Sequence, residues 1–279
     1  MKTQHPDQKA PADWLSVQSV GLVLLTLALI VGVLGYINQH PEGFTLDTFL
    51  GDFYANISAE LSSIAITVLI IDTLYRRRER QTEVRREREH LIRQLGSGVN
   101  EVAKHAAETL RAEGWLTDGS LQETDLRVAN LEEAKLWEAD LQGVNLQWAK
   151  LKKANLNRVN LVGANLVQAN LQAARMRGSD LRGANLLEAR LYRVQFHDAN
   201  LEEANLSGAH LEGAQFFNAY LGEVNVDGAF FDELTIMPDG EFWTPETDVT
   251  RFTDPNHPEF WRPSAANVTA NADDDNEYP

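Results

Sequence analysis

Residues 116–236 advance in fives, and this period constrains the fold more than any other feature of the sequence. The tripeptide Ala-Asn-Leu recurs at multiples of five residues, at 129–131, 154–156, 164–166, 184–186, 199–201 and 204–206. A period of five suits neither a helix, where the leucines would drift around the axis, nor a flat strand, where successive leucines would face opposite sides. The pattern instead predicts a solenoid in which each five forms one short side, with the central Leu and the small residue two before it pointing inward.

Coils of fifteen or of twenty residues both satisfy this rule, and the recurring substitutions favour twenty. Residues that replace the central Leu return at that spacing, and so do glycines: Met176, Phe196, Phe216 and Ile236 in one series, and Gly143, Gly163 and Gly183 in the other. We therefore expect about six four-sided coils, forming a rod about 29 Å long at roughly 4.8 Å per coil.

Each five reads as a small residue, Asp or Asn, Leu and two variable positions, and this pattern resembles that of the pentapeptide-repeat family. The resemblance spans residues 116–236 of the 279 in the chain. It implies an all-β, right-handed, four-sided β-helix. It also implies a binding or spacing surface with no shared catalytic residues, because function resides in sites grafted onto a fold.

The N-terminal sequence has a different character. Residues 1–14 are polar, and we expect them to be disordered; residues 15–37 contain no charged residue, which is long enough to cross a bilayer as a helix. A cleaved signal peptide and a buried core helix are the alternatives. The apolar run is too long for the first and is followed by no large apolar domain that would bury the second.

A second membrane span is predicted at 53–75, although two acidic residues interrupt it. At helical spacing, its polar residues Asn56, Glu60, Ser63 and Thr67 form one stripe that should avoid lipid. Such a stripe can mark an ion or proton path, but packing against the first span or against another copy of the chain is commoner. The spans could therefore support a homo-oligomer.

A cluster of arginines follows this span directly: Arg76, Arg77, Arg78 and Arg80. The connecting segment 38–52 has acidic residues but no Lys or Arg, so the positive-inside rule places the connector outside and the C-terminal region in the cytoplasm. The arginines are then positioned to contact anionic lipid. We expect a bacterial inner-membrane protein whose N-terminus and repeats are cytoplasmic.

The remaining segments are expected to cover and flank the rod. Residues 76–114 read as a charged linker helix followed by a short amphipathic helix, 97–114, which would cap the N-terminal end of a repeat domain at 115–236. Aromatic residues among prolines at 237–262 predict a C-terminal cap. Residues 263–279 read as a disordered acidic tail.

The net charge of −16 raises the possibility of a protein that mimics nucleic acid. The quinolone-resistance branch of the family resembles duplex DNA and binds gyrase. Mimicry requires a continuous negative surface, whereas the middle of this rod is rich in basic residues: Lys150, Lys152, Lys153, Arg158, Arg175, Arg177, Arg182, Arg190 and Arg193. We do not expect nucleic acid as a partner, and mimicry stays an alternative.

Residues for catalysis, metals or cofactors do not gather in any motif. The chain has no Cys, and its seven histidines are scattered without ligand spacing. Phosphate-binding loops and nucleophile motifs are also absent from the sequence. We expect neither an enzyme nor a cofactor.

A candidate partner surface comes from the outward positions of the fives. A twenty-residue coil places four apolar residues on one side of the rod: Val128, Trp148, Val167 and Leu187. A basic edge lies beside them: Lys150, Lys152, Lys153, Arg190, Tyr192 and Arg193. An exposed apolar strip of this kind is typical of a contact site. The sequence thus favours a membrane-anchored scaffold or docking module for an unidentified protein, with the mimic and a small transport oligomer as alternatives.

Overall fold

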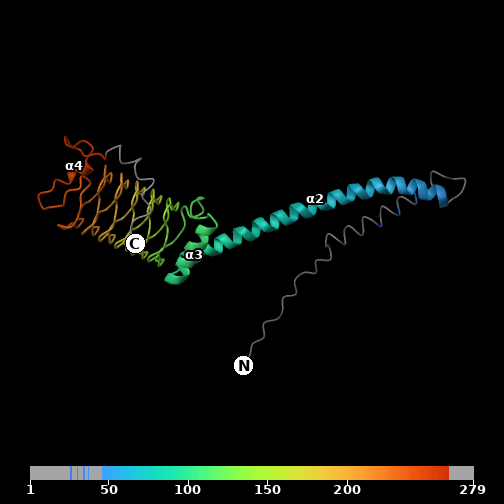
Figure 1. Cartoon of the computed structure of the whole chain (residues 1–279), viewed down its shortest axis with the longest axis horizontal. Coiled ribbons are helices and arrows are strands. Elements are labelled where there is room, and N and C mark those ends of the chain that lie inside the picture. Colours follow the sequence, from blue (N-terminus) through green and yellow to red (C-terminus); the bar gives the residue numbers. More distant parts are fainter. Residues whose placement is uncertain (1–25, 27–29, 31–33, 35–36, 38–45, 264–279) are drawn as a thin grey trace, which may run out of the picture. The chain divides into compact units, whose positions relative to one another are not determined.

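The computed structural model describes residues 26, 30, 34, 37 and 46–263, and the side chains of these positions except 46–62 and 65. The chain forms two compact units, Met1–Arg80 and Gln81–Pro279. Figure 1 labels the helices α2 (Leu46–Leu95), α3 (Asn100–Ala112) and α4 (Thr250–Thr253). The repeats between α3 and α4 form a solenoid rather than a sheet of long strands.

The solenoid advances twenty residues per coil, as predicted. From Asp125 onward, one residue in each five pairs in parallel with the residue twenty positions later, for example Asn165 with Asn185. The central residue adds a second bond between coils, as when the Leu146 amide donates to the Asn165 carbonyl at 2.7 Å. Figure 1 shows these coils stacked along the rod. The right-handed winding implied by the resemblance stays a prediction.

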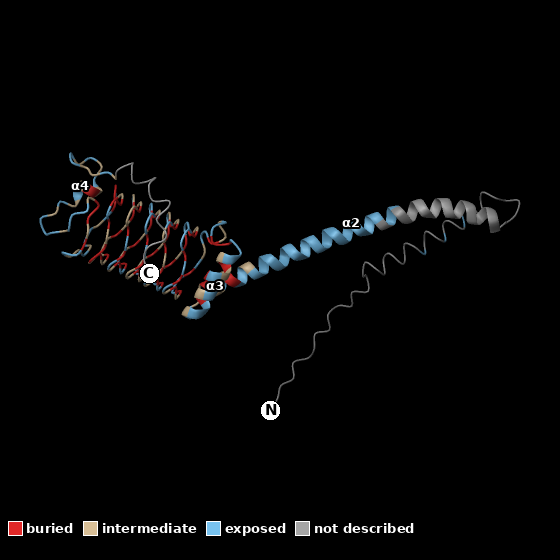
Figure 2. Cartoon of the chain, in the orientation of Figure 1, coloured by how far each residue is buried: buried red, intermediate tan, exposed pale blue. Residues whose placement is uncertain are grey.

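Two residues of each five fill the interior. The central Leu and the small residue before it are buried through the body of the rod, as for Ala164 and Leu166, which are both fully buried. Figure 2 shows this buried lining along the coils. The inward assignment of the sequence pattern is confirmed. The stacked leucines bury nearly all of their apolar surface. Each Å² of apolar surface removed from water stabilises the folded rod by roughly 25 cal/mol.

Each side of the coil ends in a tight turn at the two outward positions. The amide of the next small residue bonds to the central carbonyl, as Ala149 does to Leu146 at 3.0 Å. The second outward residue has a positive φ, +65° at Gly143 and +57° at Trp148. A type II turn requires a positive φ at this position, which favours glycine. The turn therefore explains why glycines recur there.

Helix α3 and the end of α2 cover the first coil. The buried face of α3 consists of three alanines and Leu110, and Leu95 of α2 is buried with them. Polar side chains satisfy the open backbone: Asn100 Nδ2 donates to the Glu132 carbonyl at 2.9 Å, and Arg111 Nη2 donates to the Trp137 carbonyl at 2.7 Å. The Arg111 guanidinium also lies 3.9 Å from the centroid of the Trp137 ring. Edge backbone groups would otherwise be left unpaired.

At the C-terminal end, the predicted closing centre Ile236 is wrong by one residue. Ile236 pairs with Gln215, twenty-one positions earlier, and Met237 is the buried residue instead. The turn before it contains one extra residue, like a bulge. Buried Thr235 stabilises this turn, because its hydroxyl donates to the Leu211 carbonyl at 3.0 Å. A strict count of fives cannot register such an insertion.

Within the described residues, no helix combines the length and the apolar character needed to cross a membrane. Most of the predicted span 15–37 lies outside the described residues, which include only its positions 26, 30, 34 and 37. Helix α2 runs through the predicted span 53–75, but the side chains of most of its first half fall outside the description. Residues 1–14 and 264–279 also lie outside it.

Candidate docking face of the rod

The residue just before each central position forms four ladders along the rod. The first runs through Asp125, Asn145, Asn165, Asn185, Asn205 and Asn225; the second through Asn130, Lys150, Asn170, Arg190, His210 and Phe230. The third runs through Lys135, Asn155, Arg175, Gln195, Gln215 and Ile236; the fourth through Asp140, Asn160, Asp180, Asn200 and Tyr220. These ladders have similar backbones and different side chains.

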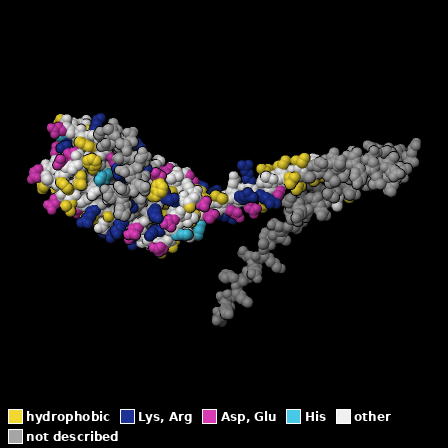
Figure 3. Space-filling view, viewed as in Figure 1, with side chains coloured by type: hydrophobic (Ala, Val, Ile, Leu, Met, Phe, Trp, Pro, Cys, Tyr) yellow, Lys and Arg dark blue, Asp and Glu magenta, His cyan; other side chains and the backbone are white. Residues whose placement is uncertain are grey.

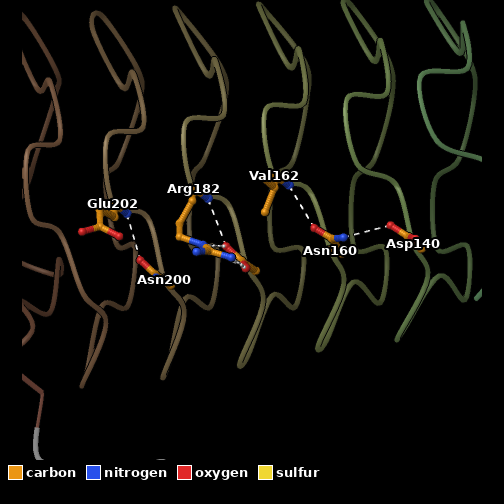
Figure 4. Close-up of polar contacts among 7 residues, drawn as sticks. Asp140, Asn160, Val162, Arg182, Asn200 and Glu202 are labelled. Atoms are coloured by element: carbon orange, nitrogen blue, oxygen red, sulfur yellow. Dashed lines mark hydrogen bonds and ion pairs between the residues drawn. The ribbon is translucent and has the colours of Figure 1, made fainter. Parts of the chain in front are cut away.

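On the first and fourth ladders, Asn and Asp side chains support the turn that follows them. Asn160 Oδ1 accepts from the Val162 amide at 3.2 Å, and Asn160 Nδ2 donates to Asp140 Oδ1 in the neighbouring coil at 2.9 Å. Figure 4 shows this arrangement, together with the equivalent bond from the Glu202 amide to Asn200. Local side-chain bonds of this type favour turns. The family's preference for Asp or Asn therefore has a structural cause.

The second ladder departs from this rule at four of its six positions. Lys150, Arg190, His210 and Phe230 cannot accept the following amide as a carboxylate or amide oxygen does. Lys150 and Arg190 are exposed, and neither forms an ion pair in the described part of the chain. His210 stacks on Phe230 with the ring centroids 4.8 Å apart and on Tyr192 at 5.1 Å. This ladder presents cations and aromatic rings in place of turn-supporting amides.

The turn beside the second ladder presents Val128 and Trp148, which are 58% and 49% exposed. Both have the positive φ that the second outward residues of the other turns also have, +56° at Val128 and +57° at Trp148. The Trp148 indole is held in place, because its Nε1 donates to Gln168 Oε1 at 2.6 Å and Gln168 Nε2 donates to Glu188 Oε2 at 2.6 Å. Its ring is thus ordered and still accessible.

We call this surface the Trp148 face and define it by the second ladder and the turn residues that precede it. A shallow groove follows this face and is lined by Glu132, Trp148, Lys150, Gln168, Asn170, Glu188, Arg190, Gly208, His210, Gly228 and Phe230. Gly208 and Gly228 stand at the turn positions two residues before His210 and Phe230, and all four residues line the groove. The structure therefore brings Trp148, Lys150 and Arg190 onto one surface.

The other residues of the predicted surface lie next to the Trp148 face. Val167 and Leu187 occupy the first outward position of the same turns and are half-buried. Lys152 and Tyr192 are half-buried, and Lys153 and Arg193 are exposed, on the turn after the second ladder. Lys153 pairs with Glu133 at 3.7 Å. Burial raises the pKa of the Tyr192 hydroxyl, and the negative charge of Glu212 raises it further. The positive charge of Arg190 acts on this pKa in the opposite direction but does not outweigh them, so the hydroxyl stays protonated.

Several residues of this face escaped the sequence prediction, among them Gln168, Glu188, His210 and Phe230. The prediction considered outward turn residues and did not follow the ladder column. A usable signal was present, because every departure from Asn or Asp before a central residue marks a ladder position that does not support its turn. At twenty-residue spacing, most of these departures gather in two columns, the second and the third ladder.

The predicted membrane residues belong to α2. Thr67 Oγ1 donates to the Ser63 carbonyl at 2.9 Å, so the end of the polar stripe is satisfied within the helix; the side chains of Asn56 and Glu60 lie outside the described residues. Arg76, Arg77, Arg78 and Arg80 are all exposed. Arg76 pairs with Asp72 at 2.8 Å.

Charges of both signs cover the rod, as Figure 3 shows for one view. Among the described residues, no group of three or more His, Asp or Glu side chains could hold a metal ion. The Trp148 face accordingly offers recognition chemistry: an ordered indole, two unpaired cations and stacked rings.

Two family models match the sequence. One, described as a pentapeptide repeat region, matches residues 149–226, and the other, described as eight copies of pentapeptide repeats, matches residues 120–158. These matches place pentapeptide repeats over residues 120–226 of the chain. This family is generally non-enzymatic. No curated protein matches the sequence.

Solved pentapeptide-repeat structures are similar to part of this chain. Rfr23 from the cyanobacterium Cyanothece 51142 is 27% identical, over 41% of this chain and 88% of that one, with a TM-score of 0.25. A protein of the Arabidopsis thaliana thylakoid lumen is 28% identical, over 36% and 70%, with a TM-score of 0.22. QnrB1, a plasmid-mediated fluoroquinolone resistance protein, is 15% identical over 41% and 63%, with a TM-score of 0.27. Likeness at this level indicates neither a partner nor an activity.

Proposed function

We propose that this pentapeptide-repeat protein is a non-enzymatic scaffold whose Trp148 face docks a protein partner through an acidic segment with an adjoining apolar side chain. The observation that carries the proposal is the second ladder, where Lys150 and Arg190 replace the Asn or Asp that would support the turn. The third ladder also carries cations, at Lys135 and Arg175, but the second ladder places its cations in a groove beside the exposed Trp148 ring.

The chemistry of the face defines the partner. Trp and Arg are the residues most enriched at binding hot spots, and Trp148 lies next to the two unpaired cations. Carboxylates on the partner would pair with Lys150 and Arg190, and an apolar side chain would cover the indole. The basic ladder also argues against mimicry of a nucleic acid, which needs continuous negative charge.

The experiment is photo-crosslinking of the intact protein in cells, with Trp148→Glu as the test variant. The variant should keep the thermal stability of the rod, because the side chain is outside the core, and should lose most crosslinks from the Trp148 face. Arg158→Glu, on a different turn, is the charge-changing control and should retain them. Unchanged crosslinking in a stably folded Trp148→Glu protein would remove this face from consideration.

We also propose that the N-terminal sequence holds the rod at the cytoplasmic side of a bacterial inner membrane. The uncharged run 15–37 supports this proposal, as do the exposed apolar side chains of α2 that precede the arginines, including Ile66, Leu69 and Ile70. Cytoplasmic reporters fused after Arg80 or Tyr278 should be active, and one inserted near Gly43 should report the outside. The opposite pattern would refute this topology.

A further inference from the structure

The cations of the Trp148 face lack carboxylate partners within the rod. Some other basic residues pair across coils, as Lys153 does with Glu133 at 3.7 Å and Arg158 with Glu138 at 3.5 Å. In contrast, Lys150 and Arg190 are exposed and form no ion pair in the described part of the chain. An extended acidic segment lying along the second ladder would satisfy both.

The chain itself carries such a segment. Residues 264–279 contain Asp273, Asp274, Asp275 and Glu277 and no Lys or Arg. The described chain ends at Pro263, just after Phe260, whose ring packs edge-on against Tyr220 at 6.2 Å. The acidic segment thus starts from the C-terminal end of the same rod.

The length of the segment suits the distance it would have to cover. From Pro263 to Asp274 an extended chain reaches roughly 36 Å. Along the rod axis, Arg190 lies two coils from Phe230 on the second ladder, which is about 10 Å. Around the rod, the segment would have to pass two sides to go from the fourth ladder to the second, which adds roughly 20 Å at about 10 Å per side. The acidic residues can therefore reach the basic ones.

The spacing of the charges also matches. Arg190 and Lys150 are two coils apart, which is about 10 Å. Asp274 and Glu277 are three residues apart, which is about 10 Å in an extended chain. A segment running from the C-terminal end toward the N-terminal end would bring Asp274 to Arg190 and Glu277 to Lys150, with Tyr278 beside Trp148.

We propose that the chain's own acidic C-terminal segment, residues 273–279, occupies the Trp148 face and competes there with the protein partner. This inference rests on the proposed function for the identity of the docking face. Because the segment is tethered, its local concentration near the face is set by the length of the linker and favours occupancy without high intrinsic affinity. The partner must displace it, so the segment would restrain docking.

The test uses the absence of cysteine from the natural sequence. In the full chain, Tyr278→Cys is combined with Gln147→Cys, next to Trp148, or with Gln142→Cys as the matched control. Both glutamines occupy the first outward position of a turn in the same part of the rod, on opposite sides of the first ladder. The Gln147→Cys pair should form an intramolecular disulfide about tenfold faster than the control pair, as a raised effective concentration predicts.

Charge changes give a second readout in the full chain. Replacing Asp273, Asp274 and Asp275 by Asn and Glu277 by Gln should abolish the difference in rate between the two pairs and increase partner crosslinking. Equal disulfide rates in the unmodified tail would overturn the inference. If the two disulfide rates are equal and Trp148→Glu still loses the partner crosslinks, the self-docking fails and the proposed function remains supported. If the two rates differ and Trp148→Glu keeps the partner crosslinks, the self-docking remains supported and the proposed function fails.

Discussion

The first and second ladders have equivalent backbone pairing but differ in the hydrogen bonds that their side chains form. Asn185 on the first ladder accepts from the Leu187 amide at 3.2 Å and from Asn205 Nδ2 at 3.2 Å. Arg190, five residues later on the second ladder, has no such bond, although its backbone pairs with the neighbouring coils in the same way. The Asn185 side chain thus supports the rod through two hydrogen bonds, whereas the Arg190 side chain is left exposed to solvent.

The largest predicted effect is the loss of stability when a buried leucine, which follows both ladders alike, is replaced by Asp. Leu166 and Leu171 follow the first and second ladders in the same coil, and both are fully buried. Leu166→Asp and Leu171→Asp should each destabilise the rod by roughly 3–5 kcal/mol, because an unpaired carboxylate enters a stacked core. Chemical denaturation measures the change. Strongly unequal losses would mean that the two sides differ in the core and not only on the surface.

Gln168→Asn is the outward control for the leucine variants. It shortens a side chain that bonds to Trp148 and Glu188 at the surface, and Asn tolerates the positive φ of this position. The loss of unfolding free energy should stay near or below about 1 kcal/mol. A loss as large as that of Leu166→Asp would refute the assignment of inward and outward positions.

The smallest predicted effect concerns pH on the first ladder. Hydrogen bonds from the Arg127 side chain and amide lower the pKa of Asp125 below its ordinary value. A lowered folded pKa adds stability above the unfolded pKa of about 3.9, and this contribution disappears as the pH falls through the folded pKa. Asp125→Asn should therefore flatten the acid limb of the stability curve slightly. An unchanged limb would show that this exposed pair contributes nothing.

The sequence alone predicted the periodic parts of the rod. Met176, Phe196 and Phe216 are spaced twenty residues apart, so their positions in the sequence were enough to predict the length of the coil and which residues stack. Ile236 was misplaced because the extra residue before it is stabilised by Thr235, whose long-range bond to Leu211 leaves no trace in a count of fives. The roles of His210 and Phe230 were missed because stacking between coils depends on ladder register rather than on outward position.

The most direct test of this account compares Asn185→Ala with Arg190→Ala by equilibrium denaturation. If ladder asparagines support the turns and substituted positions do not, Asn185→Ala should lower the unfolding free energy by about 1–2 kcal/mol. The substitution removes the Oδ1 atom that accepts two hydrogen bonds, from the Leu187 amide and from Asn205 Nδ2. Arg190→Ala should change it by less than about 0.5 kcal/mol, as an exposed residue without an ion pair. Equal losses for the two variants, or a larger loss for Arg190→Ala, would contradict the division between supporting and recognising ladders.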